Sequence, residues 1–368
     1  MLSLGPEYYS PIYYALVVFM SFLVFSQYEK YSLDHYDNAP RASVLGIVLF
    51  TLMIAVFIGL RPVSKEFFVD MEGYDDVYTA VQSSEYTVYE TGNSVLFDEL
   101  FLLFATHDIP AKYFFLFISL IYFAGIALAC SLFFPNDRMA SMLVYLSAFS
   151  TFSYATNGIK AGAAASLFLA ALALYQRRQW LWTVLLALLS LGFHQAMVLP
   201  VGAFLVCLVV KNPKVFMGIW VVCFFLSIFH ITYFQQIFSG MLDEHSASYL
   251  VSSGGHQRSA FFGGFRIDFV LYSVVPIVLG LIAIEKHKIE SIGYVFILNL
   301  YTLANAIWML CMYSDFTNRI AYLSWMLYPI VLIYPFLNED WEGPKYKIFQ
   351  WVAYGHLLFN LIMVFIYW

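Results

Sequence analysis

Long apolar runs recur along the whole of this 368-residue chain, and they limit its fold more than any other feature. A helix needs about 20 apolar residues to cross the hydrocarbon core of a bilayer. Backbone polar groups find no water inside that core, so such runs are expected to be helical. They predict an all-α, polytopic transmembrane helical bundle. Polar residues or turn formers divide it into about twelve candidate helices, at 11–27, 43–60, 113–134, 139–156, 161–175, 180–193, 197–210, 215–233, 267–284, 292–312, 320–337 and 348–367.

The composition excludes a soluble protein and a nucleic-acid-binding protein. Hydrophobic residues make up 62% of the chain and charged residues only 11%, far from the soluble range. The net charge of −6 includes no basic tract, so no DNA or RNA partner is expected. We expect a single integral membrane domain over 1–368, with longer loops at about 61–111 and 235–265. The cysteines lie in apolar runs without CxxC spacing, which is typical of small buried hydrophobes and not of a metal site.

The distribution of basic residues predicts the orientation of the chain. Cytoplasmic loops of membrane proteins carry an excess of Lys and Arg. If the loop around Lys30 and Arg41 is cytoplasmic and the helices alternate, eleven of the 18 basic residues lie on that side and both termini face outward. The remaining basic residues then lie at the outer face: Arg61, Lys65, Lys112, Lys160, Arg258, Arg266 and Arg319.

The stretch from Asn157 to Arg177 predicts an interior helix. Sixteen uncharged residues separate Lys160 from Arg177. Small residues recur at every fourth position, which lets another helix approach the backbone closely. These residues are Gly158, Gly162, Ser166 and Ala170.

The next stretch predicts a short hairpin around His194. The arm 180–192 would be roughly 20 Å long as a helix, which is short against a hydrocarbon core of about 30 Å. Basic residues at 177–178 and at 211–214 place both ends of the hairpin on one side. The tip should therefore lie inside the outer half of the membrane, where an ionisable residue is a functional candidate.

Each longer loop has a predicted feature of its own. The segment 94–106 mixes apolar residues with two acids, which suits a short helix in the membrane interface that shapes an access route for a lipid. The second loop carries two glycine pairs around His256 and Arg258. Such a loop could close over a ligand, and the alternative is a flexible connector.

Acidic and basic side chains at the predicted outer ends could carry chemistry. Carboxylates at Asp70, Asp75 and Asp76 can accept a proton from a sugar hydroxyl or hold a metal, and the alternative is a solvated acidic loop. Each arginine alone could be an interfacial anchor. Together with Lys160 and His194, Arg61, Arg266 and Arg319 could instead surround a polyanion such as a lipid-linked diphosphate.

Five short motifs lie at these outer ends. They are Gly59-Leu60-Arg61, Asp70 with Tyr74 four residues on, Asn157-Gly158-Ile159-Lys160, Gly192-Phe193-His194, and Asn318-Arg319-Ile320-Ala321-Tyr322. Over most of the chain, this set resembles the EpsG family of bacterial exopolysaccharide and capsule polymerases, relatives in role of the Wzy polymerases. The chain departs from the family pattern at Lys160-Ala161, where arginine and glutamine are usual, and at Gln195, where a small hydroxyl residue is usual. Lysine keeps the charge of arginine but loses its bidentate fork.

The resemblance implies glycan polymerisation at the outer face of the bacterial cytoplasmic membrane. A glycan on undecaprenyl diphosphate would pass to a sugar hydroxyl of another lipid-linked repeat unit, and undecaprenyl diphosphate would leave. This reaction needs a base for the acceptor hydroxyl and cations for the leaving diphosphate. The candidate base is His194 or Asp70. The candidate substrate-binding residues are Arg61, Tyr74, Asp75, Asn157, Lys160, Arg266, Arg319 and Tyr322.

The same resemblance implies the partners. They are undecaprenyl-diphosphate-linked glycans, membrane lipid and other polysaccharide export proteins. No diffusible cofactor is required, and a divalent metal at Asp75 and Asp76 is an open alternative.

Three other functions stay open at this point. A glycosyltransferase of the GT-C type that uses polyprenyl-phosphate sugars also fits carboxylates in the first large loop, and its fold could be shared. A transporter or lipid flippase should show paired repeats and charges at the bilayer midplane, whereas here the ionisable residues favour the outer ends. A membrane-bound acyltransferase has little support from a lone histidine.

Overall fold

A computed structural model describes residues 4–30, 43–83, 94–231, 233–235, 264–314, 317–340 and 343–367. Its regular elements over these residues are all helices. The chain divides into two compact units, each described here by itself. Unit 1 comprises Met1–His194 and Gly343–Trp368, and unit 2 comprises Gln195–Glu342. The single membrane domain predicted for 1–368 stays a prediction.

In the part of the chain that the structure describes, seven helices are long and apolar enough to cross a membrane, and four shorter apolar helices accompany them. The long ones are α1 (Tyr9–Phe25) with its flanking turns over Pro6–Tyr28, α5 (Ala111–Phe133), α8 (Ile159–Gln176), α14 (Ile267–His287), α15 (Ile292–Leu310), α16 with α17 (Thr317–Trp325 and Tyr328–Leu337) and α18 (Lys345–Ile362) with its continuation to Ile366. The shorter ones are α2 (Val44–Gly59), α9 (Trp180–Phe193), α10 (Val198–Val209) and α11 (Pro213–Ile228). A polytopic helical membrane protein is thereby confirmed, while the number of about twelve helices stays a prediction.

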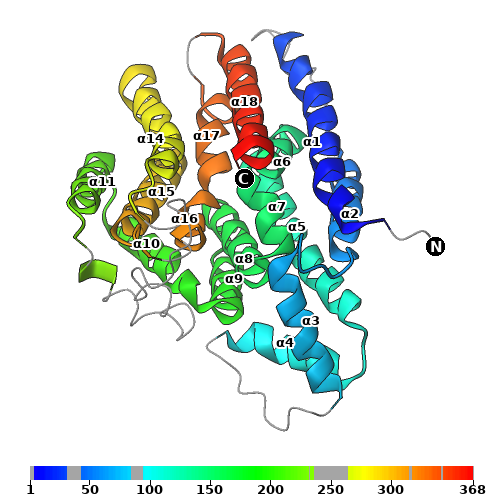
Figure 1. Ribbon diagram of the computed structural model, residues 1–368. Helices are drawn as coiled ribbons and strands as arrows, with labels where there is room; N and C mark the ends of the chain where they lie inside the picture. The colour runs from blue at the N-terminus through cyan, green and yellow to red at the C-terminus, as the bar shows by residue number, and fades with distance from the viewer. Residues whose placement is uncertain are drawn as a thin grey trace. The chain divides into compact units, whose positions relative to one another are not determined.

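α8 is the interior helix of unit 1, as its small residues predicted. It packs against α5, α7 and α9 (Figure 1). A Cβ atom on Gly162 would lie 2.6 Å from the carbonyl oxygen of Tyr154, and one on Gly125 of α5 would lie 2.7 Å from Ser166 Oγ. Real side chains do not approach so closely, so these glycines are what allow the neighbouring helices to reach the α8 backbone.

The prediction of one helix over 139–156 is wrong. The structure has α6 (Arg138–Ser147) and α7 (Phe149–Thr156), which meet at Ala148. The backbone of Ala148 is extended, with φ −64° and ψ 129°. This conformation turns the chain and ends the first helix before the second begins.

Side chains from other helices satisfy the backbone groups that this break releases. The Tyr13 hydroxyl of α1 donates to the Leu146 carbonyl at 2.8 Å. The Phe149 N–H donates to Asn360 Oδ1 of α18, also at 2.8 Å. Non-helical backbone in a membrane protein is tolerated where the protein supplies such partners, because lipid cannot.

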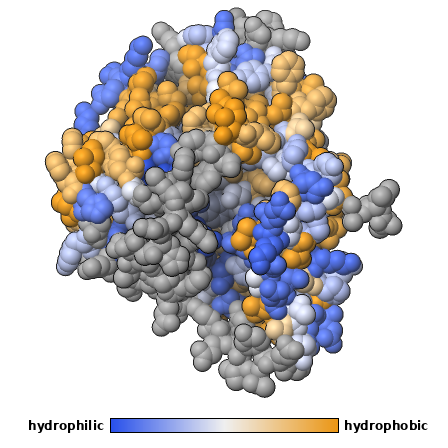
Figure 2. All heavy atoms as spheres, in the orientation of Figure 1, coloured by the Kyte–Doolittle hydropathy of each residue, from blue (hydrophilic) through white to orange (hydrophobic). Residues whose placement is uncertain are grey.

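Two helices occupy the predicted first loop of unit 1. α4 (Val95–Thr106) confirms the short helix expected at 94–106, whereas α3 (Val69–Gln82) had not been predicted. They pack against each other at one end of α5 (Figure 1), and the hydrophilic side chains of α3 gather on the visible face (Figure 2). The second predicted loop, 235–265, lies almost entirely outside the described residues, and Arg258 with it.

Unit 2 places α16, the helix that carries Arg319, through a buried polar chain. α15 packs against both α11 and α16. The Trp220 indole N–H donates to Asn305 Oδ1 at 2.9 Å, and the Asn305 amide donates to Ser324 Oγ at 3.0 Å. These two hydrogen bonds join α11, α15 and α16. Because the buried side chains that form them are paired, fixing the three helices in this way costs little in desolvation.

Candidate functional site

Arg61, which follows α2, braces unit 1 from inside. Its side chain is buried, with only 2% of the residue exposed. It donates to the Ile58 carbonyl at 2.9 Å and to the Thr156 carbonyl at 2.5 Å, and its guanidinium lies over the Phe68 ring at 5.3 Å. Burial lowers the pKa of Arg61 to about 9, which leaves the group charged at neutral pH. The arginine therefore ties the end of α2 to the turn between α7 and α8.

That turn carries the Asn157–Lys160 motif. Asn157 follows α7, and its Oδ1 atom is buried without a hydrogen-bond partner among the residues that the structure describes. Gly158 lies against Tyr154, where a Cβ atom would come within 2.7 Å of the ring. The motif thus combines a tight turn at Gly158 with a buried acceptor, Asn157 Oδ1, that receives no hydrogen bond from the described residues.

Lys160, in the first turn of α8, forms an ion pair with Asp98 of α4. The distance from Lys160 Nζ to Asp98 Oδ1 is 3.0 Å. The same ammonium lies 5.0 Å from the ring centre of Phe97. The sequence motif indicated Lys160 as a candidate ligand but not its carboxylate partner, Asp98.

Phe97 joins the surrounding motifs. Its ring centre lies 5.7 Å from that of Tyr74 in α3 and 6.3 Å from that of Phe193 at the end of α9. Gly192 allows this approach, because a Cβ atom there would already lie 3.0 Å from Leu96 Cβ. Three sequence motifs therefore meet around the first turn of α4.

His194 directly follows this contact, at the point where the chain leaves α9. Its backbone is extended, with φ −155° and ψ 119°, and its N–H donates to the Ser190 carbonyl at 3.1 Å. The side chain is half-buried. His194 is the last residue of unit 1, so the predicted hairpin around it, whose second arm belongs to unit 2, stays a prediction.

The acidic residues of the first loop lie on α3. Asp70 and Asp75 are half-buried, whereas Asp76 is exposed. Burial first and the neighbouring Asp76 second raise the pKa of Asp75. Among the described residues, no three acidic, histidine or cysteine side chains gather as metal ligands.

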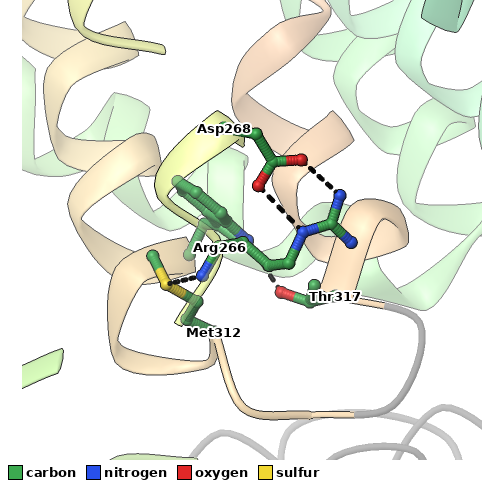
Figure 3. A network of polar contacts seen from close by, with 5 residues as sticks. Arg266, Asp268, Met312 and Thr317 are labelled. Carbon is green, nitrogen blue, oxygen red and sulfur yellow. Dashed lines mark hydrogen bonds and ion pairs between the residues drawn. The ribbon is translucent and has the colours of Figure 1, made fainter. Parts of the chain in front are cut away.

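Unit 2 holds the other predicted cations. The Arg266 guanidinium forks onto both carboxylate oxygens of Asp268, with Nε 2.9 Å from Oδ1 (Figure 3). It also stacks 3.7 Å from the ring centre of Phe269. Arg319 is exposed on α16, while Tyr322 is buried with 1% of the residue exposed. Because these residues belong to unit 2, their predicted convergence with Arg61, Lys160 and His194 stays a prediction.

A family model described as the EpsG family matches residues 44–368, nearly the whole chain. The chain belongs to the EpsG family. No curated protein and no solved structure matches it. The family supports a polysaccharide polymerase role for this EpsG chain, and its apolar helices make it a multi-pass membrane protein.

Asp98 of this EpsG chain was not among the predicted site residues, although it forms the ion pair with Lys160. It lies in an apolar segment next to Glu99, which suggested a helix in the interface. The only local signal was an acid on the apolar side of that helix, since Asp98 follows Phe97 and precedes Phe101 by three residues. A carboxylate at such a position needs a cationic partner once it is buried.

Proposed function

We propose that this EpsG chain is a membrane glycosyltransferase that joins undecaprenyl-diphosphate-linked oligosaccharide repeat units at the outer face of the cytoplasmic membrane. Membership of the family supports the polymerase role. The observation that carries the placement of the site is the Asp98–Lys160 ion pair at 3.0 Å. Around it, the first turn of α8 contributes Lys160, α3 and α4 contribute carboxylates, and His194 follows α9, all within unit 1.

The proposed reaction is a displacement at the anomeric carbon of the donor glycan. The acceptor hydroxyl oxygen forms a bond to that carbon, and the bond from the carbon to the diphosphate oxygen breaks. Undecaprenyl diphosphate leaves with the electron pair, and a base takes the hydroxyl proton. His194 is the proposed base, with Asp70 as the alternative.

Lys160 is the cation of unit 1 best placed to hold the leaving diphosphate. Its side chain is 22% exposed, so a ligand can reach the ammonium. Arg61 spends two donors on backbone carbonyls and is buried. In unit 2, Arg266 is forked onto Asp268, whereas Arg319 is exposed and is the candidate cation of that unit. Tyr74 and Asn157 would contact the sugars.

The proposal includes no diffusible cofactor. The lipid-linked glycan and membrane lipid are its partners, and other polysaccharide export proteins would receive the product. A metal bound by Asp75 and Asp76 is tested by chelation. If chelation stops polymerisation by the purified chain and magnesium restores it, the metal-free form of the proposal is wrong.

The deciding experiment supplies the substrate to the purified protein. We expect the full chain in proteoliposomes to convert lipid-linked repeat units from its host into a ladder of longer glycans, with one undecaprenyl diphosphate released per bond formed. Release would be measured by thin-layer chromatography. A chain in which His194 and Lys160 are both replaced by alanine serves as the control for background hydrolysis.

Two rival functions predict different results in the same vesicles. A GT-C-type enzyme would transfer a single sugar from a polyprenyl monophosphate and give no ladder. A flippase would move the labelled lipid across the bilayer without forming a glycosidic bond. Either result without a ladder would refute the polymerase proposal.

A further inference from the structure

The two members of the Asp98–Lys160 pair are unequally exposed. The Asp98 side chain is 3% exposed, against 22% for Lys160. The lysine is therefore the more accessible member of the pair. A ligand that approaches this end of the unit meets the lysine first.

The position of Lys160 in α8 explains why the lysine needs a partner there. It is the second residue of the helix, where the backbone N–H groups carry partial positive charge. A cation at this end of a helix is disfavoured, so a neutral contact alone would leave the ammonium free to swing toward solvent. The negative charge of Asp98 offsets the partial positive charge at the start of α8 and keeps the Lys160 side chain from turning toward solvent.

Stability alone does not account for the pair. Desolvation offsets most of the attraction in a largely buried ion pair, and apolar residues of similar size often serve folding as well. The surroundings are already apolar and aromatic, since Phe97 also contacts Phe114 and Phe193. A charge kept in this setting calls for a function.

We propose that Asp98 is a positioning residue that holds the Lys160 ammonium toward the leaving diphosphate. This inference rests on the proposed function, which assigns Lys160 to that group. An ammonium has three N–H donors. One points at Asp98, and the other two are then directed to phosphate oxygens, while the Phe97 ring lies 5.0 Å from the ammonium.

The test compares variants of the full chain in two assays, polymerisation in proteoliposomes and binding of farnesyl diphosphate to detergent-purified protein. We expect Asp98→Leu and Lys160→Met each to lower both the polymerisation rate and the affinity about 10- to 100-fold, the range for a charge-assisted hydrogen bond. The double variant should lose no more than either single variant, because the two residues act as one unit.

Conservative and control variants separate positioning from a structural role. Asp98→Asn keeps an acceptor for the ammonium and should retain more activity than Asp98→Leu. Glu99→Leu removes the exposed acid of the next residue and should leave both assays unchanged. A purely structural Asp98 would instead give losses that add to those of Lys160→Met and follow the thermal unfolding midpoint.

The outcomes also separate this inference from the proposed function. Wild-type rate and affinity in Asp98→Leu, or losses that add in the double variant, would overturn the inference and leave the polymerase standing. The wild-type chain could also bind farnesyl diphosphate more tightly than Asp98→Leu does and yet make no glycan ladder. That result would support the inference and overturn the polymerase. A wild-type chain that neither binds nor polymerises would overturn both.

Discussion

Arg61, Lys160 and Arg319 carry the same charge, but their side chains differ in what they can still bind. Arg61 is buried and donates to two carbonyls, Lys160 shares its ammonium with one carboxylate, and Arg319 is exposed. A sequence motif shows only the charge of each residue. The partners decide which cation is a brace and which can hold a ligand, and they come from elsewhere in the chain.

The first residue-scale prediction concerns Arg61. Arg61→Lys should destabilise the protein by about 1.5–3 kcal/mol, because lysine cannot donate to both carbonyls as the fork does. The thermal unfolding midpoint in detergent measures this loss. Lys65→Ala is the matched control, since that cation's side chain is 82% exposed. An Arg61→Lys chain that unfolds like the wild type but makes no polymer would show a diphosphate ligand and not a brace.

The second residue-scale prediction concerns His194. His194→Gln keeps hydrogen-bonding atoms but cannot titrate near neutral pH, so a base at this position should lose about 10²–10⁴-fold in polymerisation rate. The measurement is initial ladder formation at matched protein amount. A glutamine variant with normal polymer would make His194 a cap at the end of α9, and the base would then be Asp70.

The bounds of a helix are predicted well where an unbroken apolar run defines them, and poorly where the backbone conformation of a single residue ends the helix. α9 has the predicted bounds, Trp180–Phe193, because polar residues flank an unbroken apolar run. The break at Ala148 has no glycine or proline to mark it. It depends on Tyr13 and Asn360, which are distant in sequence and supply the missing hydrogen bonds.

The small-residue contacts of α8 give an element-scale prediction. Gly162→Ala should destabilise the fold by about 1–3 kcal/mol, because the new methyl group would meet a backbone oxygen of α7 at 2.6 Å. Gly202→Ala in α10 is the control, since no atom lies within 4 Å of the added group. Alanine favours a helix over glycine by about 1 kcal/mol, so the control should be neutral or stabilising. Equal unfolding midpoints for the two variants would contradict the packing described for α8.

At the scale of the molecule, the sequence predicts the class and the family but not the assembly of the site. Apolar run length sets where helices begin and end, so the polytopic class follows from composition and pattern. The Asp98–Lys160 pair joins α4 to α8, and no local pattern specifies which acid meets which base. Arg266 shows the converse, since its partner Asp268 is only two residues away, yet its charge alone suggested a diphosphate ligand.

The orientation of unit 1 provides the prediction for the whole molecule. Lys160 and Arg177 lie at opposite ends of α8, whose 18 residues span about 27 Å. If the motif end faces outward, a cysteine at Lys65 should react with a membrane-impermeant maleimide in spheroplasts, whereas one at Gln179 should react only after lysis. The native cysteines, Cys130, Cys207, Cys223 and Cys311, are all buried, so the background should be low. Labelling of Gln179→Cys but not of Lys65→Cys in intact spheroplasts would show that Lys160 and His194 face the cytoplasm. Polymerisation at the outer face would then be impossible at this site.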